Sequence, residues 1–200
     1  MTGRRLCLPL LLPLFTAVLA ACGDTAPEWR GHDITGVMPD LRYTLTGENG
    51  ETMIAGAYSG KVRLLFFGFT HCPDICPATL GRLKSAMTLL DAQQRERVRV
   101  LFVSVDPKRD TPERLAEYTG YFGPRFVGLT GTQAQLTELS KRYRVTYGYA
   151  EPDENGAYAV SHSGAVFVFD PQGKVRLLFN QSVPVADIAA DLRRLLEDTA

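Results

Sequence analysis

The sequence has few side chains that could hold a metal ion or act as a nucleophile. Its 200 residues include four cysteines and three histidines, so any metal or thiol centre must come from a short list. Lys and Arg total 22, as do Asp and Glu, and no long basic stripe is present. Because binding to phosphates needs clustered Lys and Arg, nucleic acid is not an expected partner. Repeats and low-complexity tracts are also lacking, and the length suits one domain behind a leader.

Long hydrophobic runs are missing except at the N-terminus. Arg4 and Arg5 precede an apolar run over residues 6–19, and small residues follow it before Cys22. This pattern is typical of a secretory signal peptide, and the run is short for a membrane-spanning helix. Residues 19–22, Leu-Ala-Ala-Cys, resemble the bacterial lipobox, which implies cleavage before Cys22 and a lipid on its sulfur. An uncleaved anchor is the alternative, and either one places the rest of the chain outside the cytoplasm.

The sequence predicts three segments. Residues 1–21 form a lipoprotein signal peptide, and residues 22–38, rich in Gly, Pro, Asp and Thr without periodicity, form a lipidated tether. Residues 39–200 form one domain, expected to be a monomer held by its lipid on the extracytoplasmic face of a bacterial membrane.

The pattern of apolar residues in that domain alternates between strands and helices. Near-continuous apolar runs over residues 62–69 and 98–105 are typical of strands covered on both faces. Turn signals at residues 48–50, 153–156 and 170–173 predict hairpins. Helical spacing predicts helices over residues 80–93, 111–121, 132–143 and 185–195. A mixed sheet between helices is the plan of the thioredoxin-like α/β fold, here with an additional hairpin insertion.

Only two cysteines are left for chemistry in the mature chain. Cys7 leaves with the signal peptide and Cys22 carries lipid, so Cys72 and Cys76 remain as thiols. They must form a local disulfide, a redox pair or part of a metal site. Cys72 follows the predicted strand and Cys76 begins the next helix, where the helix dipole favours a thiolate. Their i, i+4 spacing lets both sulfurs face one point.

Two sulfurs and an imidazole suit copper or zinc. A structural zinc site would need a fourth protein ligand, which is not evident, whereas three-coordinate Cu(I) favours thiolates. His32 lies in the predicted tether and His71 is expected to point away from the sulfurs. His162 precedes the predicted strand at residues 165–169, opposite the cysteine loop if the fold is thioredoxin-like. A structural histidine is the alternative for His162.

Three blocks of sequence resemble the signature of the SCO/SenC family, with matching order and spacing. They are residues 60–77, with Cys72-Pro73-Asp74-Ile75-Cys76-Pro77 at their end, residues 102–112, Phe-Val-Ser-Val-Asp-Pro-Lys-Arg-Asp-Thr-Pro, and residues 160–163, Val-Ser-His-Ser. This family comprises thioredoxin-like copper proteins involved in assembling cytochrome c oxidase. The resemblance implies one copper per chain, as Cu(I) and also as Cu(II), with Cys72 and Cys76 as thiolate ligands and His162 as the imidazole ligand.

Some residues near these blocks have roles that the resemblance leaves open. The family often has Asp before the ligand histidine, whereas this chain has Ser161, a difference that bears on affinity or on Cu(II) stability. Asp74 could assist a partner or cap the following helix. Asp106, Arg109 and Asp110 are interpreted as a structural turn near the site.

Two functions compete for the same cysteines. A metallochaperone would take copper from an upstream donor and pass it to the dinuclear copper centre in the copper-site subunit of cytochrome c oxidase. A thiol-disulfide oxidoreductase would use Cys72 and Cys76 as a catalytic redox pair, with an upstream thiol reductant, to reduce the cysteines of that subunit or of another extracytoplasmic partner, without an obligatory role for His162. Thiol peroxidase chemistry is disfavoured, because the usual pattern of residues before the reactive cysteine is missing.

Overall fold

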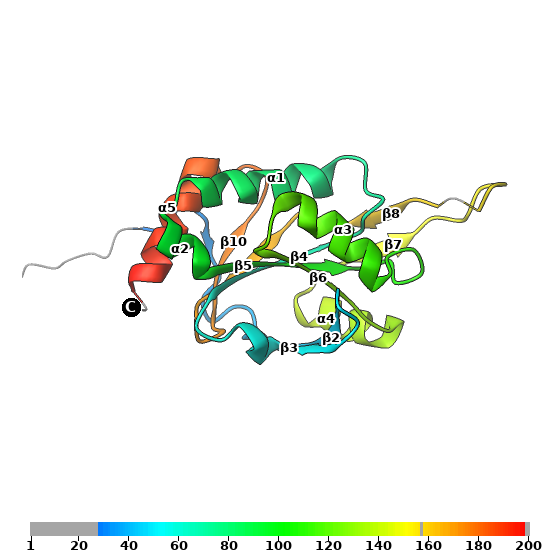
Figure 1. The fold of residues 1–200 in the computed structure, drawn as a ribbon, viewed down its shortest axis with the longest axis horizontal. Coiled ribbons are helices and arrows are strands. Elements are labelled where there is room, and N and C mark those ends of the chain that lie inside the picture. The colour runs from blue at the N-terminus through cyan, green and yellow to red at the C-terminus, as the bar shows by residue number, and fades with distance from the viewer. Residues whose placement is uncertain (1–27, 157, 199–200) are drawn as a thin grey trace, which may run out of the picture.

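A mixed sheet runs through the centre of the protein (Figure 1). The computed structural model describes residues 28–156 and 158–198; the predicted signal peptide, Cys22 and the start of the predicted tether lie outside this range. Eight strands form the sheet in the order β1-β10-β9-β4-β5-β6-β2-β3, and β7 and β8 pair separately. The strands are β1 (His32–Asp33), β2 (Thr44–Gly47), β3 (Thr52–Ile54), β4 (Val62–Gly68), β5 (Val98–Ser104), β6 (Phe126–Thr130), β7 (Tyr147–Tyr149), β8 (Val160–His162), β9 (Val166–Phe169) and β10 (Val175–Phe179).

Five α-helices accompany these strands in the described part of the chain. They are α1 (Ile75–Thr88), α2 (Ala92–Glu96), α3 (Pro112–Phe122), α4 (Gln133–Arg142) and α5 (Val185–Glu197), and a short 3-10 helix covers Ala55–Tyr58. Within residues 28–156 and 158–198, no helix has both the length and the apolar character needed to cross a bilayer.

Strand β4 lies at the centre of the sheet, as its apolar sequence predicts. All seven of its residues are buried, because helices cover both faces of the sheet. It runs parallel to β5, with Leu64 opposite Val100, and antiparallel to β9, with Leu64 opposite Val168. This mixed pairing confirms the predicted thioredoxin-like plan.

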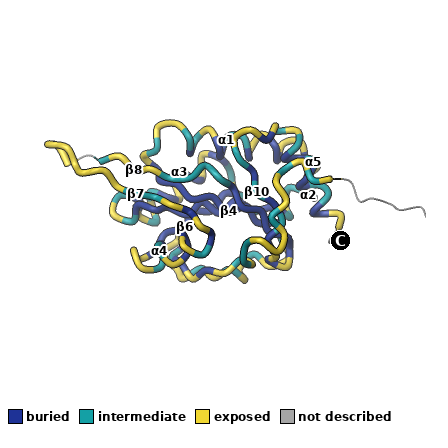
Figure 2. The backbone as a smooth tube through the Cα atoms, turned by 180° about the vertical axis from the view of Figure 1, so that it is seen from behind, coloured by how far each residue is buried: buried dark blue, intermediate teal, exposed yellow. Residues whose placement is uncertain are grey.

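The two faces of the sheet carry separate apolar cores. Side chains alternate along β4, so Leu64 and Phe66 face α1, α3 and α5, whereas Leu65 and Phe67 face α4. Figure 1 shows α1 and α3 on one side of the sheet and α4 on the other, and Figure 2 shows that the buried chain is concentrated in the central strands.

The helix starts follow their capping residues. Thr111 accepts a hydrogen bond from the backbone of Arg114, and Pro112 occupies the first turn of α3, close to the predicted start of this helix. The helix predicted to reach residue 93 is instead divided, with α1 ending at Thr88. Asp91 caps the start of α2 and forms a reciprocal capping box with Gln94. The spacing of apolar residues continues through this point and so did not reveal the new helix start.

The described part of the predicted tether packs on the domain. The side chain of Trp29 contacts the core beside α5, and β1 pairs antiparallel with β10. Buried Asp191 accepts hydrogen bonds from the backbone of Arg30 and Gly31, the latter at 2.7 Å. Two strand residues are too few for a periodic pattern, so the sequence did not reveal this contact.

Replacing Asp191 with Ala should weaken this attachment. Two backbone N–H groups would lose their shared acceptor, which costs about 1–3 kcal/mol of unfolding free energy. Denaturant titration measures the loss, and Glu197→Ala at the exposed end of α5 is the control, expected to change stability by less than about 0.5 kcal/mol. Equal stabilities of the two variants would contradict a role for Asp191 in holding residues 30–31.

Candidate metal centre

The cysteine loop connects the end of β4 to the start of α1. The chain turns after Phe69, whose carbonyl accepts a hydrogen bond from the Cys72 backbone at 3.2 Å. Cys76 is the second residue of α1 and is fully buried, whereas Cys72 is only partly buried. The backbone N–H of Cys76 donates to Cys72 Sγ at 3.4 Å. The two thiols therefore lie together with one sulfur accessible and the other enclosed.

The enclosed sulfur depends on a glycine in β4. A Cβ atom at Gly68 would lie 2.6 Å from Cys76 Sγ and 2.6 Å from the ring of Phe102. Such contacts are far below van der Waals distance, so only glycine leaves space for both groups at this position.

His162, on β8, reaches the same point from the other side. Its Nε2 lies 3.2 Å from Cys76 Sγ, and its Nδ1 lies 3.1 Å from the carbonyl oxygen of Ser163. A carbonyl only accepts, so Nδ1 carries the proton and the lone pair of Nε2 faces the sulfur. The rings of Phe66 and Phe69 contact the imidazole edge-on, with centroid distances of 6.0 and 5.6 Å. Together, the carbonyl and the two rings hold the imidazole in one orientation.

Among the described residues, Cys72, Cys76 and His162 are the one group of three or more His, Cys, Asp or Glu side chains whose ligand atoms converge. These atoms all lie within 4.8 Å of one another. The other two histidines lie elsewhere. His71 contacts Thr70 Oγ1 at 3.2 Å through Nδ1, and exposed His32 lies 3.0 Å from the side-chain nitrogen of Asn180. The three candidate ligands from the sequence thus come together, and His71 points away as expected.

Burial sets the charge states of the buried members of this group. Burial raises the pKa of the Cys76 thiol, so this side chain is a neutral thiol at neutral pH in the metal-free protein. The expectation that a helix N-terminus would make Cys76 a thiolate is therefore wrong here, because desolvation outweighs the dipole. Burial also lowers the pKa of His162, which leaves its imidazole neutral and able to act as a ligand.

Asp110 supports the chain just before Cys72. Its buried carboxylate accepts hydrogen bonds from the Thr70 backbone at 2.8 Å, from Thr70 Oγ1 at 2.7 Å and from Ser104 Oγ at 2.6 Å. Three donors on a buried carboxylate stabilise its charge and hold the cysteine loop against the end of β5. This places Asp110 in the structural role predicted for it.

Arg109 connects the cysteine side of the site to the hairpin that carries His162. Its guanidinium stacks on the ring of Tyr158, 3.8 Å from the centroid, and donates to the Tyr158 carbonyl at 3.2 Å. The buried carboxylate of Asp106 accepts from Arg109 Nε and from the Tyr158 hydroxyl, the latter at 2.7 Å. The same guanidinium lies 5.8 Å from the ring of Phe69. Arg109 thereby fixes the hairpin to the loop after β5.

The two residues left open by the sequence lie at the edge of the site. Asp74 is exposed at the start of α1, and its side chain makes no capping hydrogen bond. The capping interpretation is therefore wrong. Ser161 is exposed on the face of β8 opposite His162, with its Oγ 3.5 Å from the Gly148 carbonyl.

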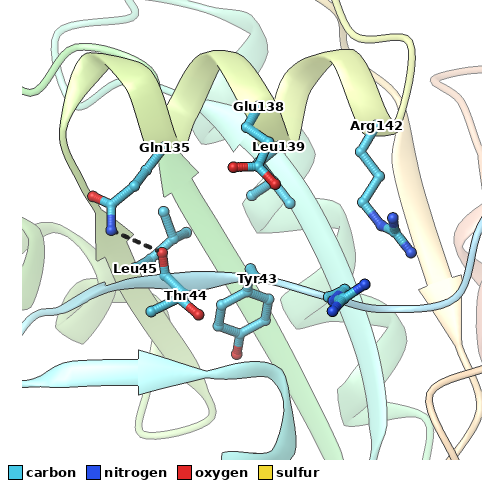
Figure 3. Close-up of a pocket in the computed structure, with 8 residues that line it drawn as sticks. Tyr43, Thr44, Leu45, Gln135, Glu138, Leu139 and Arg142 are labelled. Carbon is cyan, nitrogen blue, oxygen red and sulfur yellow. Dashed lines mark hydrogen bonds between the residues drawn. The ribbon is translucent and has the colours of Figure 1, made fainter.

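A separate cavity of about 340 Å³ lies between α4 and the segment that leads into β2 (Figure 3). Gln135 closes one end by donating to the Thr44 carbonyl at 3.2 Å. Arg42, Glu138 and Arg142 line the cavity, but none of the three candidate ligands does. It is thus distinct from the metal centre.

Comparisons with known proteins agree with this arrangement. The model of the SCO1/SenC family matches residues 38–197. The chain belongs to the SCO1/SenC family. It is 36% identical over 151 residues to the mitochondrial SCO1 homologue of Homo sapiens, which covers 75% of this chain and 50% of the human protein. This chain spans about half the length of that curated relative.

Solved structures of the family superimpose closely on the chain. ScoI of Bradyrhizobium japonicum, determined with copper bound, has a TM-score of 0.71 and 33% identity, covering 78% of this chain and 99% of that one. Apo Sco1 of Thermus thermophilus has a TM-score of 0.76 and 36% identity, covering 86% and 99%. The fold of this SCO1/SenC protein is thereby established along with its family.

Several supporting residues of this SCO1/SenC site were not identified from the sequence. Gly68 acts by leaving space for the Cys76 sulfur, and Ser163 acts through its main-chain oxygen. Tyr158 acts by stacking on Arg109, which belongs to a different segment. Their roles leave no signal at fixed spacing, although Gly68 and Ser163 lie in the matching blocks 60–77 and 160–163.

The lowered pKa of His162 predicts an acid-sensitive stability in the reduced, metal-free protein. Below about pH 6.5 the histidine is protonated in the unfolded chain but still neutral in the folded protein. The unfolded state therefore binds more protons. As the pH is lowered, the free energy of unfolding should fall by up to about 1.4 kcal/mol per pH unit, until the pH reaches the pKa of His162 in the folded protein. Urea titrations between about pH 7 and pH 5.5 measure this slope. His162→Gln should have a flatter profile, and parallel profiles would contradict the prediction.

Proposed function

We propose that this chain is a copper metallochaperone that binds one copper ion through Cys72, Cys76 and His162. The observation that carries the proposal is the convergence of two sulfurs and an imidazole nitrogen within 4.8 Å. Ligand atoms around a three-coordinate ion, at bond lengths of about 2.0–2.3 Å, lie about 4 Å apart, so small side-chain adjustments complete the site. In the copper-bound ScoI of Bradyrhizobium japonicum, a protein of this family and fold holds the same metal.

The donor set favours Cu(I) over zinc. A closed zinc site takes four protein ligands, and no further His, Cys, Asp or Glu joins this group within the described ranges. Two thiolates and one imidazole suit the softer Cu(I). Because Cys76 is a neutral thiol before binding, the metal must displace its proton, and affinity should fall as the pH falls.

The unequal exposure of the two sulfurs supports transfer of the ion. Partly buried Cys72 is accessible to an incoming ligand, whereas Cys76 is fully buried. We infer that the dinuclear copper centre of cytochrome c oxidase is the acceptor, because that is the role of the family that this chain resembles. Thiolates of the acceptor would replace Cys72 first, so the ion is never released bare. Cu(II) is a second state that the same ligands could hold.

A thiol-disulfide oxidoreductase is the second candidate. The helix N-terminal N–H of Cys76 donates to the accessible Cys72 sulfur, an arrangement that stabilises an attacking thiolate. Such an activity would reduce the acceptor cysteines before metal loading. It needs the same reduced pair and so is compatible with copper delivery at a different stage.

Removal of the imidazole ligand tests the copper site. In an anaerobic Cu(I) titration against a competing chelator, the reduced wild-type protein should bind one equivalent tightly. His162→Ala should bind about 10- to 100-fold more weakly, as expected for a lost ligand-shell group. His71→Ala is the matched control and should bind like wild type. Equal weak binding by all three proteins would contradict the copper proposal and leave the dithiol as a redox centre.

We also propose that a lipid on Cys22 anchors the domain to the extracytoplasmic face of a bacterial membrane. The basic start, apolar run and small residues before Cys22 support this proposal. In cells fed an alkyne-tagged fatty acid, wild type and Cys7→Ser should incorporate the label, whereas Cys22→Ser should not. Labelling of Cys22→Ser would show that the lipid is attached elsewhere, and no labelling of wild type would favour an uncleaved anchor.

A further inference from the structure

The hairpin that carries His162 projects from the body of the protein. This arm comprises β7, β8 and their connection, within residues 147–156 and 158–162, and it extends well beyond the sheet in Figures 1 and 2. It pairs with no strand of the main sheet. An extension of this kind adds little to the core, so its surface is available for another use.

A groove of about 440 Å³ runs between the base of the arm and the body. The arm contributes Tyr149, Ala150, Glu151, Pro152 and Tyr158, and the body contributes Lys108 and Gln133. The aromatic and small apolar side chains of the arm thus form one wall, and polar side chains form the other.

Specific contacts hold the aromatic wall in place. Gln133 donates to the Tyr147 hydroxyl at 2.7 Å, and the Tyr149 hydroxyl donates to the Val105 carbonyl. The rings of Tyr149 and Tyr158 contact each other with a centroid distance of 5.9 Å. Because these groups are already ordered, an occupant would not have to order them on binding.

The exposed part of the arm next to the groove is acidic. Glu151, Asp153 and Glu154 are exposed on the arm, and no Lys or Arg occurs from residue 147 to residue 162. Lys108, on the opposite wall, is the one cationic side chain that lines the groove. Glu151 in the groove and exposed Glu154 farther along the arm favour an occupant with Lys or Arg side chains directed toward the arm.

A chain of side-chain contacts joins the wall of the groove to the metal centre. Tyr158 forms its wall and stacks on Arg109 at 3.8 Å; Arg109 lies 5.8 Å from the ring of Phe69, and Phe69 lies 5.6 Å from the ring of His162. A segment seated in the groove would therefore contact the same arm that carries His162.

We propose that this groove is a docking site for an extended, Lys- or Arg-bearing segment of the protein that accepts the copper ion. The aromatic wall takes small apolar side chains of that segment, and its cationic side chains meet Glu151 and Glu154. This docking role rests on the proposed copper delivery, but the chemistry of the groove can be tested without metal.

The first test uses the full-length, copper-free chain in micelles of a nonionic detergent. The probe is a fluorescent peptide of four Lys-Val-Thr repeats, followed by anisotropy, with a Glu-Val-Thr counterpart. Wild type should bind the basic peptide at least about ten-fold more tightly than the acidic one. Glu151→Lys/Glu154→Lys should weaken binding of the basic peptide about ten-fold or more, whereas Glu197→Lys/Asp198→Lys at the far end of α5 should change it less than about two-fold.

A second variant separates the groove from a merely acidic surface. Ala150→Trp fills the groove without changing the charge and should also weaken binding about ten-fold. An unchanged affinity in Ala150→Trp, equal effects of the two charge-reversal variants, or no binding by wild type would overturn the docking site.

Copper transfer then connects the groove to the acceptor. The acceptor probe is the reduced, copper-free copper-site domain of the oxidase subunit. Glu151→Lys/Glu154→Lys should retain the wild-type Cu(I) affinity but transfer copper about ten-fold more slowly. Equal transfer rates would overturn only the docking role of the groove. A wild-type chain that binds no copper would overturn the proposed function, and the peptide test would then decide whether the groove is a docking site.

Discussion

The meeting of Cys76 Sγ and His162 Nε2, 3.2 Å apart at the rim of the apolar core, is the interaction on which the site depends. An imidazole is costly to bury unless its ring nitrogens have partners, whereas a neutral thiol is readily buried. Gly68 makes the space for the sulfur, and the Ser163 carbonyl fixes the imidazole by accepting the Nδ1 proton. The burial that raises the pKa of Cys76 and lowers the pKa of His162 keeps both groups neutral until a metal ion binds.

Two buried carboxylates hold the cysteine loop and the arm in position relative to each other. Asp110 anchors the cysteine loop through Thr70, and Asp106 anchors the arm through Arg109 and Tyr158. Both carboxylates lie within one turn after β5, so a single short segment positions ligands that are 86 residues apart in sequence. The block of residues 102–112 thus acts as the support between the two sides.

The same arrangement suits an ion that must be held and then released. Fully buried Cys76 would retain the metal, while partly buried Cys72 remains accessible to an acceptor. The arm carries both His162 and one wall of the groove, so an acceptor docked in the groove would contact the element that holds a candidate ligand. Aromatic contacts from Tyr158 through Arg109 to Phe69 join the two features.

Most secondary-structure elements and the candidate ligands of this protein could be predicted from its sequence, because each depends on residues that are close together along the chain. The apolar run of β4 and the turn at residues 170–173 each specify their own element, and the cysteine spacing and the three family blocks identified Cys72, Cys76 and His162. Only the tertiary structure decided the neutrality of Cys76, the docking of residues 28–33 on α5 and β10, and the Arg109–Tyr158 stack. These features depend on burial and on contacts between distant segments, and no pattern along the chain encodes how deeply a side chain lies or which remote surface it meets.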